Sequence, residues 1–178
     1  MRTLLGVIIT AATLASVSNA AGAVVETRKQ TAQGGVVCRL TDVGLNLTVK
    51  AKATGFRNEG TSSTFIICGM ESANSQEAVG TIKGLTIGMY SLNGASKSVS
   101  CTAVNGYANS TPLYATKTVS TPANGSAGVI AWDASDFGGT AGDPLAQNDY
   151  WSITCNLPAS TSVGYMVTQF NVNAPAGS

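Results

Sequence analysis

The sequence predicts an all-β protein, a single antiparallel β-sandwich of the immunoglobulin-like or Greek-key type with two disulfides. Apolar and polar residues alternate in short stretches, as they do in strands with one face in the core and one in water. Asn-Gly pairs and other glycine turns separate these stretches, and no amphipathic helix of ordinary length occurs in the 178 residues. Short strands at regular spacing with turn signals between them are typical of a sandwich.

The first element is an export signal. Arg2 is followed by an apolar run over residues 4–15 and by the small-residue exit Ser18-Asn19-Ala20, which is the pattern of a secretory signal peptide. The run is shorter than the roughly 20 apolar residues that span a bilayer. We expect residues 1–20 to be removed, with cleavage after Ala21 or Ala23 as alternatives, and residues 21–178 to form one domain with a loose tail from about residue 171.

The first half of the domain contains three expected strands. Residues 43–52 alternate, and the apolar members of this stretch would face the core: Val43, Leu45, Leu47, Val49 and Ala51. Residues 64–68 form a continuous apolar run, which is expected to be buried on both faces. Residues 82–92 form a further strand or hairpin, broken by Gly84 and Gly88. Asn93-Gly94 is the strongest hairpin signal in the chain, because both central positions of the favoured two-residue turn take positive φ.

The second half contains three more alternating stretches. Residues 98–104 would point Val99, Cys101 and Ala103 inward. Residues 150–157 place four apolar side chains on one face, namely Trp151, Ile153, Cys155 and Leu157. Residues 163–170 place Val163, Tyr165, Val167 and Gln169 on the face opposite Met166, Thr168 and Phe170.

The four cysteines fit an exported chain. Cys38, Cys68, Cys101 and Cys155 are an even set with no CxxC motif, and in an oxidising compartment such a set predicts two disulfides. Three pairings are open from sequence. We favour Cys38–Cys68 with Cys101–Cys155, and free reactive thiols are the alternative.

Composition excludes several classes of function. Only 11% of residues are charged, the net charge is +1, and there is no histidine. Removal of Arg2 with the signal takes the ten basic residues to nine, which balances the nine acidic ones. A chain with no net charge lacks the excess of basic residues that is typical of nucleic-acid-binding proteins. We also expect no membrane insertion after cleavage of the signal peptide. Without histidine there is no Ser-His-Asp or Cys-His catalysis and no His-ligated metal. We therefore expect the protein to bind no cofactor and to have no enzymatic activity.

Four segments together resemble a known group of proteins. They are residues 36–40 (VVCRL), 99–102 (VSCT), 150–158 (YWSITCNLP) and 163–167 (VGYMV). The chain is similar to a group of uncharacterised small secreted proteins of Gram-negative bacteria. These carry a VVCP opening, a central SCT strand, an aromatic-x-x-x-C-x-LP strand and a final strand containing Tyr. The resemblance covers about half of the mature chain and departs from the group at Arg39, where the group has Pro. It implies a disulfide-bonded β-sandwich outside the cytoplasm, and no activity.

The densest set of chemically useful residues lies within residues 132–151. Four acids and four aromatic residues occur there: Asp133, Asp136, Asp143, Asp149, Trp132, Phe137, Tyr150 and Trp151. Carboxylates and carbonyls at Asp133 and Asp136 would suit calcium, which takes 6–8 oxygens. The same pair would suit acid–base work on a glycoside, and an exposed Trp132, Tyr150 or Trp151 would stack on sugar. The plainer interpretation, which we favour, is that the acids cap turns and the tryptophans fill the core.

Two lysines form a second, weaker candidate. Lys50 and Lys52 share one face of a predicted strand. This face is either a binding surface or, more simply, a solvated strand face that discourages edge pairing.

The sequence therefore predicts an exported, non-enzymatic β-sandwich, secreted or periplasmic, with a glycan, a surface or another protein as partner. One alternative is a structural subunit of a surface filament, similar to a pilin, in which a partner's strand completes the sandwich. Against it, residues 173–178 contain Pro175 and do not alternate. The other alternative is a secreted hydrolase using carboxylates alone, with Asp133 and Asp136 as the pair.

Overall fold

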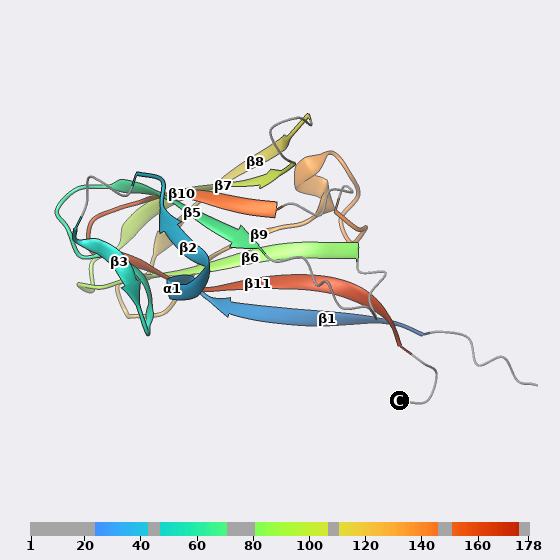
Figure 1. Ribbon diagram of the computed structural model, residues 1–178, viewed down its shortest axis with the longest axis horizontal. Coiled ribbons are helices and arrows are strands. Elements are labelled where there is room, and N and C mark those ends of the chain that lie inside the picture. The colour runs from blue at the N-terminus through green and yellow to red at the C-terminus, as the bar shows by residue number, and fades with distance from the viewer. Residues whose placement is uncertain (1–23, 43–46, 71–80, 107–110, 146–150, 175–178) are drawn as a thin grey trace, which may run out of the picture.

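The computed structural model describes residues 24–42, 47–70, 81–106, 111–145 and 151–174. Two antiparallel sheets pack face to face, which confirms the predicted all-β sandwich (Figure 1). The predicted signal peptide, residues 1–20, lies outside the described residues. Within them, neither short helix is long and apolar enough to cross a bilayer.

The first sheet has six strands in the order β3-β4-β11-β6-β9, with β1 also paired to β11. These strands are β1 (Val24–Gln33), β3 (Val49–Lys52), β4 (Gly55–Asn58), β6 (Thr81–Ser91), β9 (Gly128–Trp132) and β11 (Thr161–Ala174). β4 pairs with residues 161–163 of β11, and β1 pairs with residues 165–174. β4 and β1 therefore follow one another along the same edge of β11, while β6 occupies the other edge.

The second sheet has five strands in the order β2-β5-β10-β7-β8. These strands are β2 (Cys38–Leu40), β5 (Thr64–Met70), β7 (Lys97–Asn105), β8 (Leu113–Thr121) and β10 (Trp151–Leu157). A single helical turn, α1 (Gly34–Val37), carries the chain from β1 in the first sheet to β2 in the second. A 3₁₀ turn, η1 (Ala134–Phe137), follows β9.

The core lies between the sheets and is filled by the inward side chains of alternating strands. The predicted inward residues of β7 and β10 are all buried: Val99, Cys101, Ala103, Trp151, Ile153, Cys155 and Leu157. They face Leu85, Ile87 and Met89 of β6, none of which is exposed. Removing these apolar surfaces from water is the main stabilising term.

Two disulfides are present, as predicted. Cys38 is bonded to Cys68 and Cys101 to Cys155, which is the pairing favoured from sequence. Both bonds join directly opposed residues of neighbouring strands in the five-stranded sheet.

The prediction for residues 43–52 is wrong in its extent. β3 contains only residues 49–52, Leu47 is 95% exposed, and of the described apolar members only Val49 is buried. Val43 and Leu45 lie outside the described residues. Among the described residues, β3 is a short edge strand paired with β4 alone, so alternation in the sequence continues beyond the part of the strand that reaches the core.

Two predictions about strand faces are also wrong. The run 64–68 is not buried on both faces, because Phe65 is 57% exposed; the five-stranded sheet has the core on one side and solvent on the other. Val163 does not share a face with Tyr165, because the register shifts between these two residues. This bulge at Gly164 turns Val163 into the core and leaves Tyr165 on the outer face.

The expected hairpin at Asn93-Gly94 is wrong as well. The turn itself forms, with Gly94 at positive φ and the Asn93 side chain accepting from the amide of Ala95. However, it joins β6 in one sheet to β7 in the other, so it is a crossover between sheets. Residues 82–91 lie in one continuous strand, and residues 171–174 belong to β11 instead of a loose tail.

Candidate functional site

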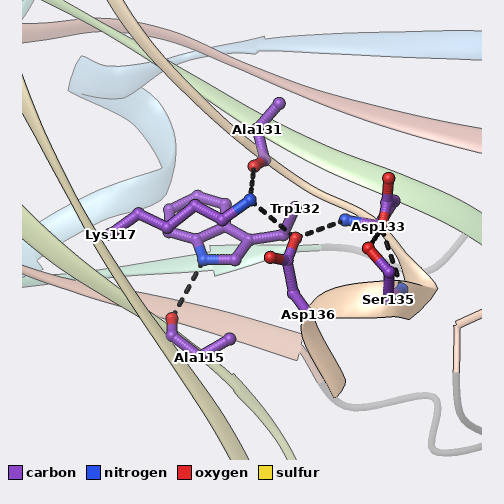
Figure 2. Close-up of polar contacts among 7 residues, drawn as sticks. All are labelled: Ala115, Lys117, Ala131, Trp132, Asp133, Ser135 and Asp136. Carbon is purple, nitrogen blue, oxygen red and sulfur yellow. Dashed lines mark hydrogen bonds and ion pairs between the residues drawn. The ribbon is translucent and has the colours of Figure 1, made fainter. Parts of the chain in front are cut away.

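The predicted site begins at Trp132, the last residue of β9. The indole is 1% exposed, and its Nε1 donates a hydrogen bond of 2.9 Å to the carbonyl of Ala115 in β8 (Figure 2). β9 and β8 are the edge strands of different sheets. This hydrogen bond therefore joins the two sheets at an edge where, in the part of the chain that the structure describes, neither strand has a further neighbour in its own sheet.

Asp133 caps the 3₁₀ turn that follows. Its Oδ1 accepts from the amide of Ser135 at 2.8 Å and from the Ser135 hydroxyl at 2.6 Å (Figure 2). Asp136 reciprocates, because its Oδ2 accepts from the Asp133 amide at 3.0 Å, which completes a capping box. The hydrogen bonds from the Ser135 side chain and amide stabilise the ionised form and lower the pKa of Asp133 below its usual value.

Lys117 connects this turn to the neighbouring sheet. Its Nζ lies 2.7 Å from Asp136 Oδ2 and 2.8 Å from the carbonyl oxygen of Ala131 (Figure 2). Lys117 lies in β8 and Ala131 in β9. The ammonium group thus holds the two edge strands and η1 together.

Of the predicted site residues that the structure describes, the two aspartates cap a turn and the two tryptophans pack in the core. Trp151 is 4% exposed and packs edge-on against Phe137, with ring centroids 5.0 Å apart. Sugar stacking required an exposed indole ring, and neither tryptophan meets that condition. Tyr150 lies outside the described residues. The described residues contain no cluster of three or more His, Cys, Asp or Glu side chains suited to a metal ion. The carboxylate of Asp133 accepts hydrogen bonds from Ser135, and that of Asp136 accepts from the Asp133 amide and from Lys117.

A cavity of about 140 Å³ lies between β1, α1, β5 and β11. Its lining residues are Gln30, Ala32, Val36, Val37, Gly69, Met166 and Thr168. Pockets that enclose a small-molecule ligand typically measure about 300–1,000 Å³. The cavity is therefore too small for such a ligand and does not adjoin the predicted site residues.

Four neighbouring strands of the five-stranded sheet present a largely polar outer face, which we call the hydroxyl face. It consists of the outward residues of β5 (Phe65, Ile67, Gly69), β10 (Ser152, Thr154, Asn156), β7 (Ser98, Ser100, Thr102, Val104) and β8 (Tyr114, Thr116, Thr118, Ser120). None of these residues is buried, and none is Asp, Glu, Lys or Arg. The fifth strand, β2, adds the exposed Arg39 directly opposite Ile67, so one cation borders the face at its β5 edge.

The strand register arranges the hydroxyl face in rows. Thr154, Thr102 and Thr116 lie directly opposite one another on β10, β7 and β8, and the hydroxyls of Thr102 and Thr116 are 2.8 Å apart. Neighbouring strands are about 4.8 Å apart, so the three threonines span about 10 Å. A parallel row consists of Phe65, Asn156, Ser100 and Thr118.

Two aromatic rings stand at opposite corners of the hydroxyl face. Phe65 is 57% exposed on β5, and Tyr114 is 64% exposed on β8. Three strand spacings and four residue steps separate them in the register, which corresponds to about 20 Å on a flat sheet. The rings therefore flank a polar, uncharged strip of serine, threonine and asparagine.

Sequence reasoning missed this face. The polar members of the alternating strands were assigned to solvent, and Phe65 was assigned to the core. The available signal was that the outward positions of β7 and β10 contain Ser, Thr, Asn or Val and no charged residue. Four adjacent strands with no charged outward residue are unusual, because solvated strand faces normally include lysine and glutamate.

Comparisons with known proteins identify no family. No family model and no curated protein matches the chain. A solved chain of turnip yellow mosaic virus has 11% identity and a TM-score of 0.41, covering 96% of this chain and 91% of that one. The family 11 carbohydrate-binding module from Clostridium thermocellum, in complex with a β-1,3-1,4-mixed-linked tetrasaccharide, has 7% identity and a TM-score of 0.34, covering 91% and 95%. Similarity at these scores carries no argument about function.

Proposed function

We propose that this chain is an exported, non-enzymatic binding module and that its hydroxyl face binds a neutral polysaccharide. Two disulfides are typical of an oxidising, extracytoplasmic environment. Within that environment we assign the protein to the periplasm or the medium, after removal of residues 1–20.

The observation that carries the proposal is the composition of the hydroxyl face. Hydroxyl and amide side chains such as Thr102, Thr154 and Asn156 both donate and accept hydrogen bonds, as sugar hydroxyls do. The apolar C–H faces of a sugar ring pack against aromatic rings, and Phe65 and Tyr114 are more than half exposed. The four strands of this face contribute no charged side chain, and Arg39 of β2 borders it only at the β5 edge. This favours a neutral ligand, because an ionic one would lose hydration over most of the face without gaining a counter-charge.

The disulfides support this use of the face. Cys101 and Cys155 are bonded on the inner side of β7 and β10, one residue before Thr102 and one after Thr154 in the chain. A disulfide between neighbouring strands restrains the sheet and so holds its outward side chains at fixed spacing. Preorganisation of that kind reduces the entropy lost when a ligand binds.

The two alternatives receive less support. Asp133 and Asp136, the pair required by a hydrolase, are engaged as a helix cap and in the ion pair with Lys117. A pilin-like subunit leaves a gap beside its last strand for a partner's strand. Here β11 pairs on one edge with β6 and on the other with β4 and β1 of the same chain.

The test is a depletion assay with insoluble neutral polysaccharides: cellulose, xylan, β-1,3-glucan, mannan, starch and chitin. The mature protein should bind at least one of them. The double variant Phe65→Ala/Tyr114→Ala and the near-isosteric double variant Thr102→Val/Thr154→Val should each lose at least about tenfold in affinity, the equivalent of about 1.4 kcal/mol. Val129→Ala, at a 45% exposed position on the other sheet, is the control and should bind normally. Lack of binding across the panel, or normal binding by both double variants, would overturn the proposal.

A further inference from the structure

The hairpin formed by β3 and β4 places three cationic side chains around the carboxylate of Glu59. Lys50 and Lys52 each place Nζ 4.0 Å from a carboxylate oxygen of Glu59, and Nη1 of Arg57 lies 3.7 Å from Oε1 of the same residue. The hairpin forms an edge of the six-stranded sheet and is separate from the hydroxyl face on the other sheet.

The charges of this cluster do not balance. Three cations and one carboxylate leave a local charge of +2, in a chain whose total charge is only +1. Lys50 and Arg57 are also directly opposed in the register, and like charges in that position repel each other. The arrangement is therefore unfavourable by itself and would be relieved by an additional anion.

The contacts of the three cations with Glu59 are also long. The distances of 3.7–4.0 Å to Glu59 are longer than a charge-assisted hydrogen bond. Nε of Arg57 is buried, and it is the one buried side-chain polar atom in the described residues that has no hydrogen-bond partner. Arginine and lysine together are well suited to oxyanions, because the guanidinium offers a planar fork of donors and each ammonium a compact charge.

We propose that Lys50, Lys52 and Arg57 bind the sulfate or phosphate groups of an anionic polysaccharide, independently of the hydroxyl face. A tetrahedral sulfate or phosphate group presents more acceptor oxygens than the two of a single bridging carboxylate. A polymer is favoured over a membrane surface because Leu47, at 95% exposure, and Val36 of the adjacent α1, at 80%, are the large apolar side chains described as exposed near the cluster. Two such side chains do not make the broad apolar face that surface insertion needs.

The test measures binding to heparin as a sulfated probe, with uncharged dextran as the blank. Salt gradients on heparin resin and titrations at several salt concentrations are run on the mature protein. Lys50→Gln/Lys52→Gln should elute at lower salt and should reduce the slope of log affinity against log salt by about 2, since each lysine that neutralises an anionic group contributes about one unit. Glu59→Gln should elute at higher salt, because it removes the competing carboxylate.

The matched control is Lys29→Gln/Lys83→Gln, which removes the same charge from the same sheet. Lys29 pairs with Gln169, and Lys83 follows Ile82, which pairs with Phe170, whereas the hairpin adjoins residues 161–163. This control should leave the salt slope unchanged. The proposal is overturned if the control lowers the slope as much as Lys50→Gln/Lys52→Gln does, if Glu59→Gln weakens retention, or if the wild type is not retained. Binding to phosphatidylglycerol vesicles without binding to heparin would also overturn it.

Discussion

Cys101 and Cys155 are bonded at directly opposed positions of β7 and β10, with their Cα atoms 4.1 Å apart. Cys38 and Cys68 have the same relationship across β2 and β5, at 3.9 Å. Both bonds therefore lie within the five-stranded sheet and do not join it to the other sheet. The sheet that carries the hydroxyl face is the one that the disulfides reinforce.

Removal of a disulfide should destabilise the fold and loosen that face. Cys101→Ala/Cys155→Ala opens a sequence span of 54 residues and should lower the free energy of unfolding by about 2–4 kcal/mol. Cys38→Ala/Cys68→Ala opens a span of 30 residues, for which the loop-length term is about 0.5 kcal/mol smaller. Urea denaturation measures both values. Equal stability of the wild type and the Cys101→Ala/Cys155→Ala variant would contradict this account of the sheet.

The cap at Asp133 should make stability depend on acid pH. The lowered pKa of its carboxyl in the folded state, caused first by the Ser135 hydroxyl and then by the Ser135 amide, means that the unfolded state binds the proton more tightly. The contribution is therefore complete above the ordinary pKa of 3.8 and is lost as the pH falls through the lower folded value. Asp133→Asn keeps a good cap and removes the titration.

Thermal denaturation from about pH 6 to about pH 2 tests this linkage. The melting temperature of the wild type relative to Asp133→Asn should fall with acidification. A difference that stays constant over the whole range would rule out the cap as an acid-sensitive element.

The ion pair between Lys117 and Asp136 should stabilise the open edge of the sandwich. Lys117→Met removes the ammonium that contacts both Asp136 and the carbonyl of Ala131, and should cost about 1–2 kcal/mol of unfolding free energy. A double-mutant cycle with Asp136→Asn isolates the pair. A coupling energy near zero would mean that the lysine acts only through the carbonyl. Binding to neutral polysaccharide should remain normal in all three variants, because the side chain of Lys117, opposite the inward Cys101, lies on the other side of β8 from the hydroxyl face.

The indole of Trp132 should be a stabilising hydrogen-bond donor and not a ligand contact. Trp132→Phe leaves the Ala115 carbonyl without the indole donor and should lower stability by about 1–3 kcal/mol. Because Trp132 and Trp151 are both buried, native fluorescence should have the emission of buried indole and resist quenching by acrylamide. Ready quenching in the folded state would contradict their placement in the core.

The parts of the fold that could be predicted from sequence are those set by local alternation. Val99, Cys101 and Ala103 alternate with polar residues, and they lie in the core as expected. Alternation does not reveal where a strand stops being covered, so Leu47 was assigned to the core although it is exposed. It also does not reveal a bulge, and the extra residue at Gly164 reversed the face of Val163 relative to Tyr165.

The candidate site was less accessible to sequence reasoning, because it depends on strand order. Thr102 and Thr154 are far apart in the chain and become neighbours only when β10 inserts between β5 and β7. The residues predicted to form a site, such as Asp133 and Trp132, are close together in sequence. In the structure Asp133 caps the η1 turn and Trp132 packs in the core. Lys50 and Lys52 were recognised as sharing a face, but Arg57 and Glu59 join them only through the hairpin register.

The most direct test of the central claim is a map of ligand contacts by NMR. The ¹⁵N-labelled mature protein would be titrated with soluble hexasaccharides of cellulose, xylan and β-1,3-glucan. We predict that amide shifts caused by at least one of them cluster on β5, β10, β7 and β8, with Thr102, Thr154 and their row neighbours among the largest. Shifts confined to the β3–β4 hairpin or to the η1 turn, or no shifts with any neutral hexasaccharide, would contradict the assignment of the hydroxyl face as the binding surface.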